Sequence, residues 1–384
     1  MIRRTCVILL LLVPAIALAQ TKPATSSLRT YETRYYTIYT DLGRDGAREA
    51  EVRMTRMADE YRQRTRDFSG ELRGKLPFYL FRNEADYHAA GGTPNTAGEY
   101  DPNAGRLMTF AGGEQANLAT WYTVQHEGFH QFADQVIGRG MPIAVNEGLA
   151  EYFGEALFTG DSFVAGVIPP WRLKRVRASF EGKKFMSLRE LLSLSHKEWN
   201  KALSQDNYDQ VWMLVQYMVH GDDGAYRDSF AAFIRDISTG RPWDAEWQPR
   251  FGDIDAFETK WRSYWTNLPD DPTADQYVET TLRTLTSFLA RATARRQRFD
   301  SLEAFASATE KGELKSSESD WLPASLINDA FKRAATFQTI GASFAIVSDA
   351  PRPPRIVYTP KQGSQMVGRF TLKGSRVEGV TVER

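Results

Sequence analysis

The chain has 384 residues, of which 42% are hydrophobic and 12% aromatic, enough for one or two well-packed domains. Its 48 basic residues balance its 48 acidic residues. This balance excludes the strong overall field that draws a protein to nucleic acid or to a membrane surface. We therefore expect no nucleic-acid partner.

The first residues have the pattern of a secretory signal. Two arginines precede an apolar run that begins at Cys6, and 17–19 form a small-residue cleavage site. The run has about thirteen residues, whereas a membrane anchor, the alternative, needs roughly 20. We predict a signal peptide over 1–19, a polar linker over 20–29, and a secreted or periplasmic protein. After cleavage it would have no cysteine and no stable membrane insertion.

The next segments alternate between strand and helix patterns. Hydrophobicity alternates over 34–40, which indicates a strand, and 43–68 has the apolar spacing of a helix. A second strand candidate covers 77–81. Segments 97–100 and 106–110 flank a stretch of turn residues and predict a hairpin.

Beyond Gly113 the hydrophobic period is helical. The candidate helices cover 116–136, 144–157, 187–195, 205–220, 224–238 and 253–266. Turn residues gather in 268–272, which is the best internal boundary. We therefore expect one domain over 30–268.

The remaining residues, 270–384, form a C-terminal region whose role the sequence does not indicate. A helical pattern covers 273–311, and a β-like pattern interrupted by prolines covers 342–384. We interpret a basic run in the helical part as a solvated helix face rather than a binding patch. That run consists of Arg291, Arg295, Arg296 and Arg298. Together the elements predict an α+β protein.

His126, Glu127 and His130 form an H-E-x-x-H motif. Residues i and i+4 of a helix share one face, so His126 and His130 can point at the same metal ion. Glu127 is displaced around the helix, where it can reach a metal-bound water rather than the metal. The motif predicts a metal-binding helix that also carries a general base.

Two carboxylates follow on the next predicted helix. Glu147 and Glu151 are also i and i+4, so both can face the first helix after a turn. One can complete a His-His-Glu zinc set, and the other can accept the remaining ring N–H of a ligand histidine. We favour Glu147 as the ligand. The alternative is a buried histidine–carboxylate network that bridges the two helices without metal.

H-E-x-x-H followed by N-E-G-x-A-E-Y at 146–152 resembles the gluzincin metallopeptidases, especially the peptidase MA-like group of secreted bacterial proteins. The resemblance implies a thermolysin-like catalytic domain with an N-terminal mixed sheet and a mostly helical C-terminal part, followed by a helical and then β-like tail. It also implies that Glu147 is the third zinc ligand and that Glu151 orients a zinc-bound histidine, here matched by His126. The segment 98–110 is similar to the stretch that forms the edge-strand hairpin beside the active-site cleft in this group.

The segment 208–217 resembles a helix of the aminopeptidase N and leukotriene hydrolase relatives. In those proteins the first tyrosine donates a hydrogen bond to the oxyanion, and the matching residue here is Tyr208. Simple core packing is the alternative, because apolar helices often open with tyrosine. The chain lacks the G-A-M-E-N motif of those exopeptidases, so the resemblance does not extend to aminopeptidase activity.

The sequence predicts a secreted zinc-dependent metallohydrolase that holds one Zn²⁺ per chain and acts on a peptide or protein substrate. The metal would lower the pKa of its bound water to roughly 7, and Glu127 would take the proton and return it to the leaving amine. The alternatives are a zinc amidase acting on cell-wall peptides and a non-catalytic scaffold with a vestigial zinc site. We interpret His88, His196 and His220 as ordinary surface or capping histidines.

Overall fold

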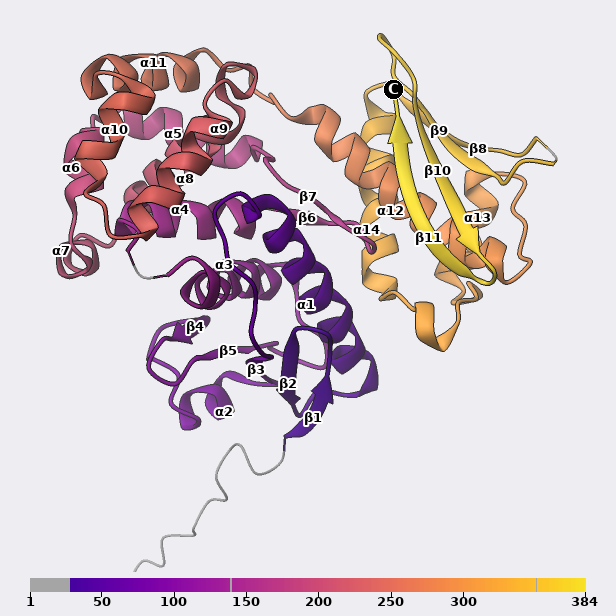
Figure 1. Ribbon diagram of the computed structural model, residues 1–384. Helices are drawn as coiled ribbons and strands as arrows, with labels where there is room; N and C mark the ends of the chain where they lie inside the picture. The colour runs from indigo at the N-terminus through magenta and orange to yellow at the C-terminus, as the bar shows by residue number, and fades with distance from the viewer. Residues whose placement is uncertain (1–27, 139, 350) are drawn as a thin grey trace, which may run out of the picture.

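A computed structural model describes residues 28–138, 140–349 and 351–384. Figure 1 shows two parts, each built from one larger sheet with its own helices, and the chain passes from the first to the second between residues 267 and 274. The α+β class predicted from the sequence is confirmed. None of the helices in the described ranges is long and apolar enough to cross a bilayer. The predicted signal peptide and most of the predicted linker lie outside these ranges.

The N-terminal sheet is mixed. Its strands are β1 (Arg29–Glu32), β2 (Tyr36–Thr40), β3 (Leu76–Phe81), β4 (Gly98–Asp101) and β5 (Arg106–Phe110). They lie in the order β1-β2-β3-β5-β4, with β2, β3 and β5 parallel and the two edge strands antiparallel to their neighbours. The predicted hairpin is β4–β5, and β4 is an edge strand. β1 begins at Arg29, and Leu28 packs on the sheet, so both belong to the folded part although they were predicted as linker.

Helices cover both faces of this sheet. They are α1 (Arg44–Thr65), α2 (Glu84–Ala89) and α3 (Leu118–Val136). Phe78 and Leu80 of β3 point into the main core, whereas Phe81 packs with Tyr87 of α2 and Met108 of β5 in a separate small cluster. Successive side chains of a strand alternate between the two faces. The face with the main core packs against α1 and α3.

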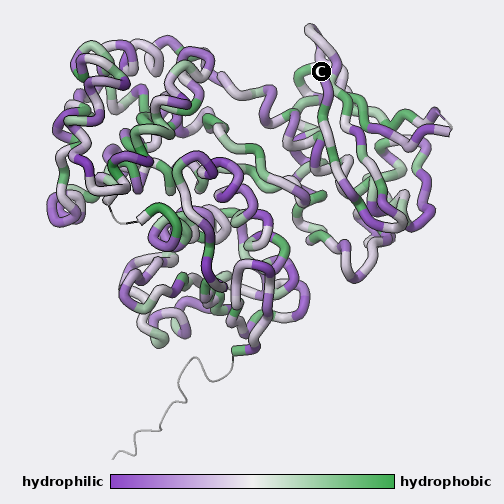
Figure 2. Tube along the Cα trace, viewed as in Figure 1, coloured by the Kyte–Doolittle hydropathy of each residue, from purple (hydrophilic) through white to green (hydrophobic). Residues whose placement is uncertain are grey.

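Two further helices, α4 (Ile143–Gly154) and α8 (Gln205–His220), complete the centre of the first part. α4 packs between α3 and α8, and Figure 2 shows hydrophobic positions gathered along these helices. Gly148 makes the close approach of α4 to α8 possible, because a Cβ atom there would lie 2.5 Å from the carbonyl oxygen of Val211. α3 and α4, which carry the predicted metal ligands, are therefore fixed within one packed layer.

The remaining elements of the first part surround this centre. A short hairpin, β6–β7, extends from it toward the C-terminal part (Figure 1). The elements are β6 (Leu157–Phe158), β7 (Phe163–Val164), α5 (Pro170–Glu181), α6 (Leu188–Ser193), α7 (His196–Lys201), η2 (Gly221–Gly224), α9 (Arg227–Ser238), α10 (Trp243–Phe251) and α11 (Ile254–Asn267).

The C-terminal part is an antiparallel sheet packed on helices. Its elements are α12 (Ala274–Ala294), α13 (Leu302–Glu310), η3 (Glu318–Asp320), α14 (Ala324–Thr339), β8 (Ser343–Val347), β9 (Arg355–Thr359), β10 (Met366–Lys373) and β11 (Arg376–Glu383). The strands lie in the order β11-β10-β9-β8. α12 packs against three of them and α14 against β8. The helical and then β-like order predicted for this region is present, with α14 as an unpredicted addition.

The helix expected over 187–195 is α6, which is shorter and ends at Ser193. The next helix, α7, was not expected, and each of the two has its own serine capping box. α5 was not expected, because Arg172 interrupts the apolar period of its buried face. A charged residue at a buried position hides a helix from a search for hydrophobic periodicity.

The interpretation of the basic run as a solvated face is wrong for Arg291. Its side chain is 5% exposed and forms ion pairs with Asp161 of the β6–β7 turn and with Asp320 of η3. Arg291 therefore joins the two parts of the chain, whereas Arg295, Arg296 and Arg298 are exposed as expected.

Candidate metal centre

α3 holds the H-E-x-x-H motif in a fixed position against α4. The helix begins where the side chain of Asn117 accepts a hydrogen bond from the backbone N–H of Thr120. Gln125 is buried, and its amide donates to carbonyl oxygens at and just after the C-terminal end of α4. These bonds satisfy carbonyl groups that a helix end leaves without partners. They also fix the rotation of α3 that turns the next residue, His126, toward α4.

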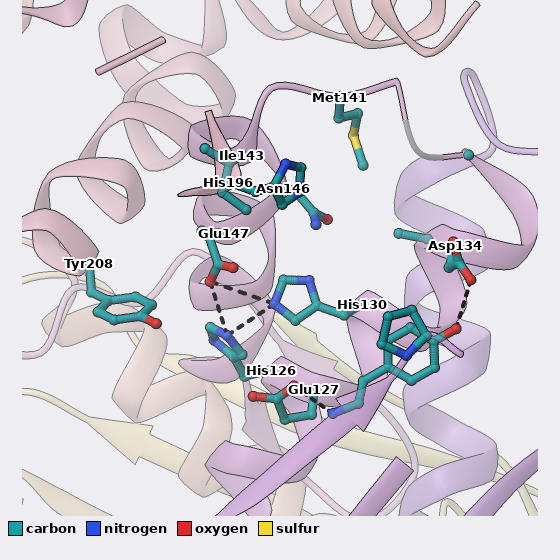
Figure 3. Close-up of a pocket in the computed structure, with 14 residues that line it drawn as sticks. His126, Glu127, His130, Asp134, Met141, Ile143, Asn146, Glu147, His196 and Tyr208 are labelled. Atoms are coloured by element: carbon teal, nitrogen blue, oxygen red, sulfur yellow. Dashed lines mark hydrogen bonds and ion pairs between the residues drawn. The ribbon is translucent and has the colours of Figure 1, made fainter. Parts of the chain in front are cut away.

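The structure brings His126, His130 and Glu147 together at one point, and this group could hold a metal ion. Nε2 of His126 lies 3.2 Å from Nε2 of His130, and Oε2 of Glu147 lies 3.4 Å and 3.6 Å from these two atoms (Figure 3). A tetrahedral zinc site with ligand bonds of about 2.0–2.1 Å would separate neighbouring ligand atoms by about 3.3–3.4 Å. The three ligand atoms thus already have the spacing of three corners of a zinc tetrahedron.

The electrostatics of the group favour a cation. Burial lowers the pKa of both histidines, but Glu147 outweighs it, so the pKa of His126 is well above its usual value and that of His130 is also raised. Burial raises the pKa of Glu147, but the two histidines hold it well below its usual range. The group therefore stabilises positive charge at the point where its ring nitrogens and carboxylate converge. A divalent cation bound there would supply that charge.

Glu151 lies on the other side of the His126 ring. Its Oε1 is 3.1 Å from Nδ1 of His126, within ion-pair distance although off the axis of a straight hydrogen bond. Its Oε2 accepts hydrogen bonds from Tyr122 and Arg172. Burial raises the pKa of Glu151, but Arg172 and His126 lower it to about 2. Glu147 thus belongs to the group that could hold a metal ion, whereas Glu151 contacts the opposite edge of the His126 ring.

Glu127 lines the same pocket without joining the ligand group. Its Oε2 accepts a hydrogen bond of 3.0 Å from the backbone N–H of Tyr100 on the edge strand β4. Burial raises the pKa of this carboxyl group. The edge strand thus fixes one carboxylate oxygen and forms a wall of the pocket.

Tyr208, in the first turn of α8, approaches the ligand group from the other side of the pocket (Figure 3). Its ring lies 6.2 Å from the ring of His126 and packs edge-on against Trp199. Burial, with Glu147 and Glu127 nearby, raises the pKa of the phenol well above its usual value. The phenol therefore keeps its proton at neutral pH and can donate a hydrogen bond.

The pocket that joins these residues has a volume of about 420 Å³. Several of its residues were not predicted as site residues. They are Tyr100, Pro102, Ala133, Asp134, Gly138, Met141, Ile143, Asn146 and His196. Of these, Tyr100 and Pro102 had a sequence signal, because the resemblance placed their hairpin beside a cleft, and Asn146 belongs to the N-E-G motif.

The three remaining histidines differ in their surroundings. His88 bonds the carbonyl oxygen of Gly92 just beyond α2, as a capping histidine does. His196 is exposed but lines the pocket. The prediction of a surface or capping position is wrong for His220, whose ring stacks on Tyr152 and whose Nε2 is hydrogen-bonded to the hydroxyl group of that residue at 3.0 Å. Its burial lowers its pKa to about 4.

The fold and the site define an α+β protein with a His-His-Glu group, buried at His126 and partly buried at the other two residues, that could hold a metal ion. Residues 120–244 match a family described as "Protein of unknown function (DUF1570)". This stretch contains the three candidate ligands. It also contains Glu127, Glu151 and Tyr208. No curated protein matches the chain.

Proposed function

We propose that the protein is a secreted or periplasmic zinc-dependent metallohydrolase of the gluzincin type that hydrolyses peptide bonds. The observation that carries this proposal is the spacing of the His126, His130 and Glu147 ligand atoms, with the carboxylate of Glu127 in the same pocket. A purely structural histidine–carboxylate network does not require a separate, partly buried carboxylate on the wall of a 420 Å³ pocket.

Each residue then has a distinct role. When bound, Zn²⁺ would supply a Lewis acid that polarises a carbonyl group and lowers the pKa of a bound water to roughly 7. Glu127 would accept a proton from the attacking water and return it to the leaving amine, a contribution of typically 10²–10⁴-fold.

Tyr208 would stabilise the oxyanion that develops on the substrate carbonyl. Its phenol is protonated and lies across the pocket from Glu127, with a raised pKa that Glu147 and Glu127 help to set. A well-placed donor of this kind contributes on the order of 2.7–4 kcal/mol to the stability of a transition state. A donor for the oxyanion and a base that can reprotonate an amine favour an amide bond as the substrate.

The experiment is a zinc analysis followed by a digest. We expect about one zinc per mature chain by mass spectrometry, and cleavage of a peptide library that a chelator abolishes and added zinc restores. A chain that holds no zinc after reconstitution would contradict the proposal. Cleavage confined to cell-wall peptides would instead support the amidase, and bound zinc without any cleavage would support a vestigial site.

A further inference from the structure

Arg172 of α5 is a buried arginine that the proposed mechanism does not use. Its side chain is 1% exposed and forms ion pairs with carboxylates of two helices. Nη2 donates to Glu151 of α4 at 2.5 Å, and Nη1 donates at 2.7 Å to Glu155, the residue that follows α4. Nε donates to Asp209 of α8 at 2.9 Å. One planar guanidinium group is therefore hydrogen-bonded to three separate carboxylates.

One side of this arrangement leads to the metal ligands. Glu151 presents Oε1 to Nδ1 of His126 and Oε2 to Arg172 and to the hydroxyl group of Tyr122. With both oxygens engaged, the carboxylate cannot rotate without breaking a charge-assisted contact. Because the partner of a ligand histidine fixes the orientation of its ring, the position of Arg172 bears on where Nε2 of His126 points.

The other side leads to the candidate oxyanion donor. Asp209 follows Tyr208 directly, is fully buried, and also pairs with Arg175. Nη2 of Arg172 lies 3.4 Å from the backbone carbonyl oxygen of Tyr208. The guanidinium group also lies 4.2 Å from the ring centroid of Trp212, one turn further along α8. The first turn of α8 is thus fixed by the same side chain that holds Glu151.

We infer that Arg172 is a positioning residue that couples the two sides of the pocket, fixing His126 through Glu151 and Tyr208 through Asp209. The inference rests on the proposed function, because it concerns the same metal site. An arginine is required at this position, since a planar group with five N–H donors can serve three carboxylates, whereas the compact ammonium group of lysine cannot match that geometry.

The test is the zinc affinity of Arg172→Lys, measured by competition with a chromophoric chelator. The substitution keeps the positive charge among the buried carboxylates but loses the planar fork. We expect zinc binding to weaken by roughly 10–100-fold, as for the loss of a residue that orients a ligand. The matched control is Arg291→Lys, which changes a second buried arginine that also bridges two carboxylates, Asp161 and Asp320, in another part of the chain. It should lower the melting temperature but bind zinc like the parent.

A second variant keeps the inference testable if Arg172→Lys does not fold. Asp209→Asn leaves Arg172, Glu151 and both histidines in place and removes only the charge beside Tyr208. We expect it to weaken zinc binding severalfold, by less than Arg172→Lys, although Asp209 contacts no metal ligand. We expect kcat to fall and KM to stay unchanged, because Tyr208 acts in the transition state.

The outcomes separate this inference from the proposed function. If the parent binds zinc and both variants bind it equally well, Arg172 has only a structural role and the inference is wrong. An equal loss of zinc affinity in Arg291→Lys would also overturn it, because general destabilisation would then explain the effect. A parent that binds no zinc would contradict the proposed function itself.

Discussion

Glu147 and Glu151 lie one turn apart on α4 and differ in what they face. Glu147 lies within 3.6 Å of both ring Nε2 atoms, whereas Glu151 lies beside Nδ1 of His126 and pairs with Arg172. The spacing in the sequence predicted that both could face α3, and we favoured Glu147 as the ligand. The resemblance made the same assignment, and the distances support it.

Alanine substitutions at the two glutamates should therefore differ in their effect on zinc. Glu147→Ala removes a ligand atom, so most of the zinc affinity should be lost. Glu151→Ala leaves all three ligand atoms and should weaken binding by roughly 10–100-fold. Competition with a chelator measures both constants. Intact binding in Glu147→Ala together with no binding in Glu151→Ala would reverse the ligand assignment.

Tyr208→Phe isolates the phenol hydroxyl group. The ring can keep its edge-on contacts with His126 and Trp199, so zinc content and melting temperature should match those of the parent. Turnover of a cleaved peptide should fall by about 10²–10³-fold if the hydroxyl group stabilises the oxyanion. Unchanged turnover would leave Tyr208 as a core residue that happens to line the pocket.

The remaining pocket residues show what single-residue patterns could not predict. His196 reaches the pocket from α7 through tertiary packing and belongs to no spacing that indicates chemistry, whereas Asn146 lies in the N-E-G motif but had no role assigned to it. Arg172 was equally hidden, because its partners Glu151 and Asp209 are distant in the sequence. The H-E-x-x-H motif was predictable because its two histidines share one helix face.

At the scale of elements, the contact between α4 and α8 sets the relation of Glu147 to Tyr208. Gly148→Ala would place a Cβ atom 2.5 Å from the carbonyl oxygen of Val211 and 2.6 Å from a methyl group of Val215. Overpacking of this kind costs typically 1–3 kcal/mol, partly offset by the higher helix propensity of alanine, worth about 1 kcal/mol. We expect a net loss of stability and lower zinc affinity, because the helices must separate.

Urea denaturation of Gly148→Ala measures this effect. Gly113→Ala is a suitable control, because a Cβ atom at Gly113 would meet no atom within 4 Å. Stability equal to or above that of the parent in Gly148→Ala would contradict the packing argument.

The pair of His220 and Tyr152 joins the end of α8 to α4 and should make stability depend on pH. Burial lowers the pKa of His220 to about 4, whereas in the unfolded chain it stays near 6.5. The unfolded state therefore takes up the proton first as the pH falls. The contribution of His220 is complete above about pH 6.5 and is lost progressively as the pH falls toward 4, by on the order of 2 kcal/mol.

His220→Gln should remove this pH dependence, because the amide does not titrate in this range. Free energies of unfolding for the parent and the variant, measured at pH 7, 5.5 and 4.5, give the comparison. The difference in free energy of unfolding between the parent and the variant should shrink as the pH falls. A constant difference across the three values would show that His220 does not titrate as proposed.

Some helices and strands were predicted from the sequence and others were missed, and the difference has physical reasons. Long amphipathic helices such as α3, α8 and α11 have a clear hydrophobic period, and the β4–β5 hairpin has distinct turn residues. Short elements such as α2 and β6 are too brief to show a period. The burial of Arg172 and Arg291 depends on carboxylates supplied by other elements, so no local pattern could indicate it.

At the scale of the whole molecule, ion pairs join the C-terminal part to the part with the metal centre. Arg291 of α12 bonds Asp161 of the β6–β7 turn, and Arg44 and Arg48 of α1 pair with Glu318 of η3. The guanidinium group of Arg48 also lies over the ring of Trp321. The candidate ligands come only from α3 and α4, so the C-terminal part contributes none of them.

The central claim, that this pocket hydrolyses peptides with Glu127 as the base, is tested most directly by Glu127→Gln. The amide has nearly the same shape and leaves the three candidate ligands unchanged, so zinc content and melting temperature should match those of the parent. It cannot accept a proton from water at neutral pH, so peptide cleavage should fall by roughly 10²–10⁴-fold. The measurement is kcat/KM on a library peptide, with zinc content determined on the same samples. Cleavage as fast as that of the parent at equal zinc content would contradict the claim.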